Sequence, residues 1–220
     1  MRLPDLFRES SILEKLRPFA DDPDIFVTFT EILKVGINPV GKWSDPIGVY
    51  AYPVREEFEH FEQKMVPFGG NRPFAYILRA KGNRLELQDY TRERLVADLK
   101  TIEDTFMPML LALPTDNGQA PIADPEAYWN AFRDRTCDVS SNHPGLTMWH
   151  FTGKVARYIA HRFPNRDHRM VWNSLFRACG YDSVVDRNGG FIATNEPSQA
   201  VFLSIKGFTV VEACNNDLLL

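Results

Sequence analysis

Strand-like segments lie near both ends of this chain, whereas helix-like segments fill its middle. The early and late segments are short and rich in β-branched and aromatic residues, as in 25–30 and 208–213. Between them, residues 91–179 space their apolar side chains by three and four, which is the helical period. Such segregation favours an α+β fold over the regular alternation of a doubly wound sheet. We therefore expect one α+β domain over residues 1–220, with a helical segment at 91–179.

The first third of the chain predicts four strands and two helices. Residues 1–20 carry a short amphipathic pattern that ends in Asp21-Asp22-Pro23, and they predict an N-terminal helix that docks on the domain. Residues 54–66 place Phe58, Phe61 and Met65 at helical spacing, so they predict a surface-packed helix. The predicted strands are 25–30, 47–53, 74–80 and 84–87.

The middle of the chain predicts a series of capped helices. Thr91 caps a long helix that stops before Pro114, and Asp124-Pro125 opens the next one. Two more are expected at 146–162 and 167–179, the second ended by Gly180. The first long helix is expected to bury the stripe Leu95, Leu99, Ile102, Phe106 and Leu110.

The stretch Gly180 to Ser204 predicts a strand, a loop and a second strand. Tyr181 to Asp186 carries two valines between turn residues, and Asn188-Gly189-Gly190 is a strong signal of chain reversal. The run 200–203 is short, apolar and free of Gly and Pro, as a buried strand should be. Glu196 and Gln199 stand at the mouth of this strand. One interpretation is a plain hairpin with a polar loop, and the other is a binding site at a strand edge.

Composition limits the classes of function. The formal net charge of −4 gives no sign of a broad surface that grips duplex nucleic acid, although it leaves a local site open. Three widely spaced cysteines form no CxxC pair, which indicates a reducing cytoplasm and neither a disulfide framework nor a zinc knuckle. Acidic residues interrupt the apolar N-terminus, and no apolar run approaches the ~20 residues that cross a bilayer. We expect a cytoplasmic protein with no membrane partner.

Familiar catalytic and metal motifs are missing from the sequence. His150, His161 and His168 are eleven and seven residues apart, so no i, i+4 pair exists for a helical metal site, and we expect no metal. The sequence contains no GxSxG, P-loop or GxGxxG pattern. Classical hydrolase and nucleotide-loop chemistry therefore have no support.

Two early strands offer side chains for a ligand. Tyr50 and Tyr52 share one face of strand 47–53, and Gly48 leaves the backbone bare beside them. They form either sheet aromatics packed on a helix or an aromatic surface for a flat heteroaromatic ligand. Thr28 and Thr30 share a face of the first strand, where threonine is either a tolerated β-former or a ligand contact.

The order of these segments resembles the ADP-ribosyltransferase superfamily, which cleaves NAD. The relevant segments are FVTFT, IGVYAYP, GYDSVVD and NEPSQAVFL, and they cover residues 25–54 and 180–213. The sequence is particularly similar to phage-borne and bacterial toxin-like members. The resemblance implies a split β-sheet core with a helical insertion in the middle of the chain.

The resemblance also implies roles for individual residues. In the histidine–tyrosine–glutamate branch, Thr28 falls where the family has a ribose-binding histidine, and Gly48 and Tyr50 match the nicotinamide-stacking GxY motif. Gln199 falls where the family has its glutamate, so Glu196 becomes the candidate for the missing negative charge. Phe29 and Thr30 beside Thr28, and Lys42 and Trp43 in the turn-rich loop 34–46, are the other expected NAD contacts.

These positions imply an enzyme that transfers ADP-ribose from NAD to a protein side chain or a nucleic acid. Breaking the nicotinamide–ribose bond builds oxocarbenium character, which a fixed acceptor near the ribose stabilises. The resemblance suggests a phage effector or the toxin of a toxin–antitoxin pair, with an antitoxin as a further partner. The main alternative is a catalytically silent module of the same fold that binds a partner, and a third interpretation is an unrelated α+β domain in which the motifs are only strands.

Overall fold

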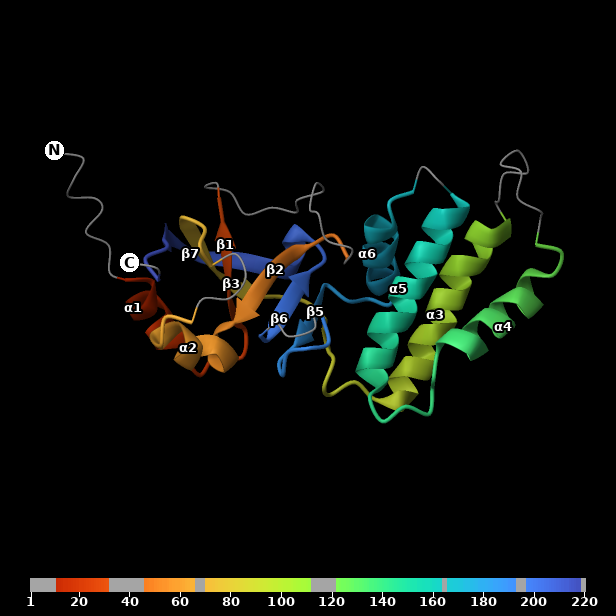
Figure 1. Cartoon of the computed structure of the whole chain (residues 1–220), viewed down its shortest axis with the longest axis horizontal. Coiled ribbons are helices and arrows are strands. Elements are labelled where there is room, and N and C mark those ends of the chain that lie inside the picture. The colour runs from red at the N-terminus through yellow and green to blue at the C-terminus, as the bar shows by residue number, and fades with distance from the viewer. Residues whose placement is uncertain are drawn as a thin grey trace.

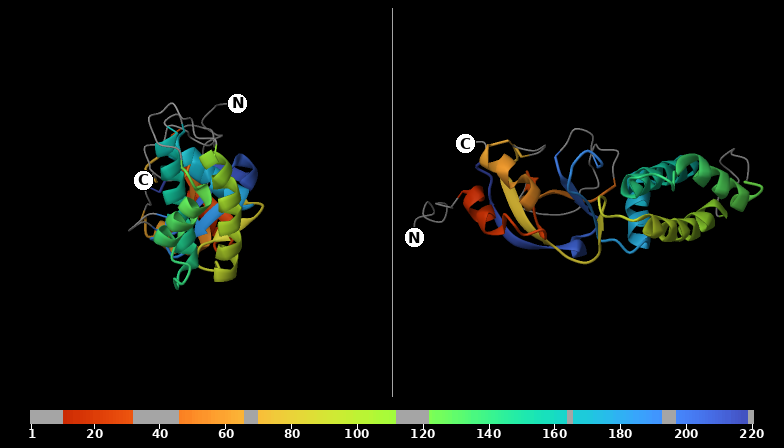
Figure 2. Two further views of the ribbon diagram at one scale, coloured as in Figure 1. Left: turned by 90° about the vertical axis from the view of Figure 1, so that its right-hand side faces the viewer. Right: turned by 90° about the horizontal axis from the view of Figure 1, so that it is seen from below.

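The computed structural model describes residues 11–31, 46–65, 70–111, 122–163, 166–192 and 197–218. A seven-stranded mixed sheet lies at one end of an elongated molecule, and helices α3 to α6 form a lobe at the other end (Figure 1, Figure 2). The chain enters the lobe after strand β4 (Arg84–Glu86) and returns to the sheet at β5 (Ser183–Asp186). The predicted α+β class is confirmed, and the described part of 91–179 contains helices and no strand.

The elements follow the predicted segments closely. The remaining strands are β1 (Ile25–Thr30), β2 (Val49–Pro53), β3 (Phe74–Ala80), β6 (Gln199–Phe202) and β7 (Phe208–Asn215). The helices of the sheet end are α1 (Ile12–Leu16), α2 (Val54–Glu62) and the 3-10 turns η2 (Arg17–Phe19) and η4 (Ile205–Gly207). The lobe consists of α3 (Arg92–Leu111), α4 (Pro125–Thr136), α5 (Pro144–Arg162) and α6 (His168–Ala178).

Helix boundaries have local causes. The Asp124 carboxylate accepts a hydrogen bond from the backbone N–H of Ala127 and so caps α4, and Asp167 caps α6 in the same way through Arg169. Helix α2 ends before the predicted residue 66, since Lys64 adopts a left-handed backbone with φ of 56°. Within the described part of 1–20, the expected single helix is the short α1 followed by η2.

The sheet divides into two halves that separate between β1 and β2. The strand order is β4-β5-β6-β2-β1-β3-β7, with β4 and β5 parallel and every other pair antiparallel. Only Phe26 and Val27 of β1 pair with β2, opposite Pro53 and Tyr52, whereas β1 and β3 pair along six residues. Strand β2 therefore turns from β6, which it pairs at 49–51, to β1 at its far end.

The two halves pack against each other through strand side chains. Phe26 of β1 meets Phe202 of β6 edge to face at 5.3 Å between ring centroids, and Phe202 meets Phe208 of β7 at 5.2 Å. Strands β6 and β7 are separated by three others in the sheet order, so this contact requires the sheet to curl. The cluster between the halves holds Phe26, Val49, Ala51, Tyr76, Leu78, Val185, Ala200, Phe202 and Phe208.

A buried polar cluster joins the helical lobe to the sheet. The hydroxyls of Tyr90 and Tyr181 both donate to Oδ2 of Asp98 on α3, over 2.5 and 2.6 Å. Burial, then Asp98, raises the pKa of both tyrosines, so their hydroxyls stay protonated as donors. The Arg94 guanidinium donates to Tyr181 and lies over its ring. This Asp98 cluster fixes the start of α3 to the segment that leads into β5.

Candidate functional site

Tyr50 and Gln199 lie on one face of two neighbouring strands. Tyr50 of β2 pairs with Val201 of β6, and Ala51 pairs with Ala200, so the register places Gln199 one step further along, opposite Tyr52. Because side chains alternate along a strand, Tyr50, Tyr52, Val201 and Gln199 share a face. The sheet therefore brings two of the residues that the sequence singled out into diagonal positions on adjacent strands.

The side-chain amide of Gln199 makes no hydrogen bond to any of the described residues. Gln199 as a residue is only 8% exposed, and its backbone pairs with Asp186 of β5. Its amide nitrogen and oxygen are nevertheless not fully enclosed, so water or a ligand can reach them. Its two donors and its acceptor are therefore available to a bound molecule at the start of β6.

The ring of Tyr50 stands at the border of the helical lobe. It is half-buried against the lobe's apolar cluster, and its hydroxyl donates to the carbonyl oxygen of Pro46 over 2.8 Å. The pKa of Arg169 on α6 is raised first by the hydrogen bonds that its guanidinium donates to Asp167, and Tyr50 lies close enough to contribute. Tyr50 thus presents an aromatic surface whose polar end is tethered and flanked by a cation.

Thr28 occupies the opposite face of the sheet. Its neighbours Val27 and Phe29 pack in the cluster under α2, whereas Phe26, two residues away, packs between the sheet halves. The 4% exposed side chain of Thr28 donates instead to the carbonyl oxygen of Tyr50 over 2.7 Å. Alternation along β1 thus places the Thr28 hydroxyl on the sheet face opposite the side chains of Tyr50 and Gln199, and the expected convergence of all three on one NAD molecule stays a prediction.

The remaining predicted NAD contacts have mixed positions. Phe29 is 3% exposed and packs on Tyr52 and Phe61 in the core, and Thr30 is half-buried on the same face as Thr28. Lys42, Trp43 and Glu196 lie outside the described residues. None of these five is therefore placed beside Gln199 by the described structure.

The packing of strand β6 explains why position 48 is a glycine, and the sequence alone did not reveal this contact. A β carbon at this position would lie 2.5 Å from Cγ1 of Val201 and 2.7 Å from the carbonyl oxygen of Phe202. Strand β6 therefore makes the close backbone approach that the sequence attributed to a ligand. Glycine at 48 lets β2 enter the sheet beside β6.

A buried carboxylate anchors the loop that follows β5. Asp186 is fully buried and accepts hydrogen bonds from the Gln88 amide over 2.6 Å and from the backbone N–H groups of Phe191 and Ile192 over 2.7 and 3.1 Å. Three donors satisfy a carboxylate that could not otherwise be buried. Asp186 therefore anchors the loop next to Gln199, and both of its carboxylate oxygens already accept hydrogen bonds.

Arg187 fixes the same loop to three distant segments. Its guanidinium pairs with Glu86 over 2.8 Å and with Glu56 over 3.0 Å, and it donates to the carbonyl oxygen of Pro23. Burial alone lowers the pKa of Arg187, but the two glutamates outweigh it and raise the pKa above its ordinary value. The loop's first residue is thus held in position by ionic contacts that local sequence patterns cannot show.

The far end of the loop is fastened by Ser198 and Glu57. The Ser198 hydroxyl donates to the carbonyl oxygen of Arg187 over 2.7 Å, which closes the loop at its base. Its backbone N–H donates to Glu57 of α2 over 2.9 Å, and the other Glu57 oxygen lies 2.9 Å from Nδ1 of His60. These contacts fix the residue directly before Gln199, so the start of β6 is preorganised.

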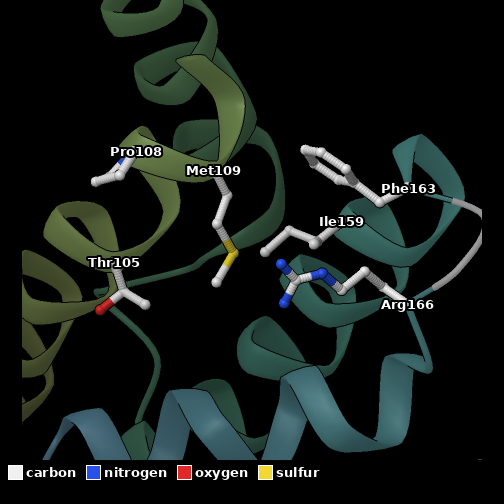
Figure 3. Close-up of a pocket in the computed structure, with 6 residues that line it drawn as sticks. All are labelled: Thr105, Pro108, Met109, Ile159, Phe163 and Arg166. Atoms are coloured by element: carbon white, nitrogen blue, oxygen red, sulfur yellow. The ribbon is translucent and has the colours of Figure 1, made fainter. Parts of the chain in front are cut away.

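The described residues contain no group of three or more His, Cys, Asp or Glu side chains that could hold a metal ion. A cavity of about 240 Å³ lies between α3 and α5 in the helical lobe and is lined by Thr105, Pro108, Met109, Ile159, Phe163 and Arg166 (Figure 3).

Across the described ranges, no helix combines the length and apolarity needed to cross a membrane.

Comparison with known proteins adds no family to these observations. No protein-family model, no curated protein and no solved structure matches the chain. The site is therefore defined by its own geometry. On one sheet face it offers a tethered aromatic ring, an amide with no hydrogen bond to the described residues, and an anchored loop base, which together suit the binding of a polar, partly aromatic ligand.

Proposed function

We propose that the protein binds NAD on the face of β2 and β6 and transfers its ADP-ribose to a macromolecular acceptor. The observation that carries this proposal is the side-chain amide of Gln199, which makes no hydrogen bond to the described residues and lies on the same sheet face as Tyr50, diagonally across the two strands. The order of the segments, which resembles ADP-ribosyltransferases, supports it independently. In this arrangement Tyr50 stacks on nicotinamide, and Gln199 hydrogen bonds to the adjoining ribose.

In the proposed reaction, Gln199 and the loop before β6 have separate roles. Departure of nicotinamide leaves positive charge on the ribose, and an acceptor held near the 2′-hydroxyl stabilises that charge. The Gln199 carbonyl oxygen supplies a neutral acceptor. Glu196, three residues earlier, is the proposed source of negative charge, and the anchors at Arg187 and Ser198 hold the loop that carries it.

A catalytically silent NAD-binding module is the second candidate, and one observation favours it. Two described carboxylates beside the start of β6, Asp186 and Glu57, are both occupied by hydrogen bonds. If Glu196 does not reach the ribose, the face binds NAD without stabilising the transition state. Substitution Gln199→Glu separates the two cases, since it places a carboxylate at the family's position.

Release of nicotinamide from NAD by the purified protein tests the proposal. We expect turnover in wild type, a loss of about 10²–10³ in rate for Glu196→Gln, and nearly unchanged NAD affinity in that variant. If the protein is a silent module, wild type should bind NAD without releasing nicotinamide, and only the Gln199→Glu variant should release it. Absence of both NAD binding and nicotinamide release in wild type and in Gln199→Glu would overturn both candidates.

A further inference from the structure

Every exposed residue of helix α5 is basic. Across Pro144–Arg162, all of which is described, the exposed residues are His150, Lys154, Arg157 and His161. Their spacing of four, three and four places them on one side of the helix. At 1.5 Å per residue they form a line about 16 Å long. We call these four residues the basic stripe.

The sequence around the basic stripe is depleted of acidic residues. Between Asp138 and Asp182 the chain has six lysines and arginines and one acidic residue, Asp167. The chain as a whole has a formal net charge of −4, so this segment carries a charge opposite to the rest. The net charge of the whole chain conceals this asymmetry. It gives no sign of a broad surface that grips duplex nucleic acid, but it leaves a local basic site open.

The cations of the basic stripe are not neutralised by carboxylates. Among the described residues, neither Lys154 nor Arg157 forms an ion pair, whereas the sheet end pairs Lys15 with Glu212, Arg79 with Asp22 and Arg84 with Asp24. Partial burial of the ring, then Lys154 and Arg157, lowers the pKa of His150, because the two cations disfavour protonation of a ring one to two helical turns away. A bound anion would offset this effect and favour the protonated ring.

Neighbouring contacts hold the two strongest cations in place. The Arg157 guanidinium lies over the ring of Trp172 at 5.7 Å and donates to the carbonyl oxygen of Gly153. The Lys154 ammonium donates to the carbonyl oxygen of Thr136 at the end of α4 over 3.4 Å. Because these contacts leave other N–H donors of both groups unused, the side chains are positioned but still able to bind an anion.

We propose that the basic stripe of α5 binds the phosphate backbone of a nucleic acid. A line of two cations and two histidines, all hydrogen-bond donors, matches a regular row of phosphates. The stripe has no exposed Trp, Tyr or aliphatic anchor of the kind that dominates protein interfaces. Membrane insertion is disfavoured, since the opposite face of α5 is buried in the core through Met148, Phe151 and Val155. The inference does not depend on NAD binding.

Binding of a labelled nucleic acid at several salt concentrations, without NAD, tests this inference. The probes are a fluorescein-labelled single-stranded RNA of about 20 nucleotides and a DNA duplex of the same length, titrated between about 50 and 200 mM salt. Each single-strand phosphate contact contributes about −0.7 to the slope of log K against log salt. We expect the double variant Lys154→Gln, Arg157→Gln to flatten the RNA slope by about 1.4.

A matched control removes the same charge elsewhere. Arg17 and Lys100 are exposed and ion-paired with Glu62 and Asp104, so Arg17→Gln, Lys100→Gln should leave the slope unchanged. If loss of the Arg157–Trp172 contact prevents folding, Lys154→Glu alone carries the test, because its side chain is exposed. Failure of both probes to bind, or equal slopes in wild type and stripe variants, would overturn the inference. Preferential binding of polyglutamate or of anionic lipid vesicles would also overturn it.

Discussion

The Thr28 hydroxyl donates to the carbonyl oxygen of Tyr50 over 2.7 Å, just beyond the last backbone pair between β1 and β2. The backbone ladder stops at Val27 and Tyr52, so a side-chain hydrogen bond continues the connection where the two strands separate. Thr28 therefore closes the junction between the sheet halves from the side opposite the candidate site.

Replacing this hydroxyl should affect stability and spare ligand binding. Thr28→Val keeps the shape but leaves the Tyr50 carbonyl without its partner, which should lower the free energy of unfolding by about 1 kcal/mol. Thr28→Ser keeps the hydroxyl and should retain most of the free energy of unfolding. Thermal melts and NAD titrations of both variants provide the check. A clear loss of NAD affinity in Thr28→Val without a change in melting temperature would place Thr28 in the site and contradict this account.

The Asp98 cluster should be a major stabilising contact between lobe and sheet. Asp98→Asn weakens the two tyrosine hydrogen bonds, and we expect a loss of about 2–3 kcal/mol, because hydrogen bonds to a buried charge are the strong ones. Asp104→Asn, at an exposed position of the same helix, should have little effect.

Cys179 reports on the same cluster. Burial, then the Asp98 charge, raises the pKa of its thiol to about 12, so it should react slowly with a thiol reagent at pH 8. Removing the Asp98 charge and loosening the cluster should speed modification. Equal modification rates in wild type and Asp98→Asn, followed by mass spectrometry at Cys179, would show that the cluster does not control this junction.

The Arg187 contacts should determine the order of the loop after β5. Arg187→Met removes the partly buried cation that Glu56 and Glu86 share, leaving them only Arg55 and Arg84, and we expect a loss of about 1–3 kcal/mol with faster proteolysis at 187–192. Arg55 pairs with the same Glu56 from an exposed position, so Arg55→Met should cost less than about 1 kcal/mol. Equal melting temperatures for the two variants would contradict the anchoring role.

His150 should make stability depend on pH in a predictable direction. Its folded pKa lies below its ordinary value, owing to partial burial and then Lys154 and Arg157, so the unfolded chain takes up a proton first as the pH falls. Stability should therefore decrease as the pH falls below about 6.5, the unperturbed value. His150→Asn should reduce that decrease, as measured by chemical unfolding at several pH values. An unchanged pH profile would contradict the assignment.

Much of the fold could be predicted because its signals are local. The stripe from Leu95 to Leu110 is buried as its helical period requires, and Asp124 and Asp167 cap the helices that follow them. Strand positions were likewise evident from β-branched and aromatic runs such as 25–30.

The arrangement of the site was less predictable, since it depends on pairing between distant strands. Alternation fixes which residues of one strand share a face, but only the register between β1 and β2 shows that Thr28 and Tyr50 lie on opposite faces. The contacts of Arg187 join residues 101 and 131 positions apart, so no local pattern could reveal them. The close approach of strand β6 to Gly48 is another contact between segments distant in the sequence.

Calorimetric titration of NAD into wild type and Gln199→Leu tests the central claim, that NAD binds between Tyr50 and Gln199. Leucine keeps the approximate size of the side chain and removes the unpaired amide, so the fold should remain stable. Gln63→Leu, at an exposed position at the end of α2, is the matched control. We predict that NAD binds wild type and Gln63→Leu equally, and that Gln199→Leu binds about tenfold more weakly, as the loss of about 1.4 kcal/mol implies. Equal NAD affinity in wild type and Gln199→Leu, or no binding to wild type, would contradict the account.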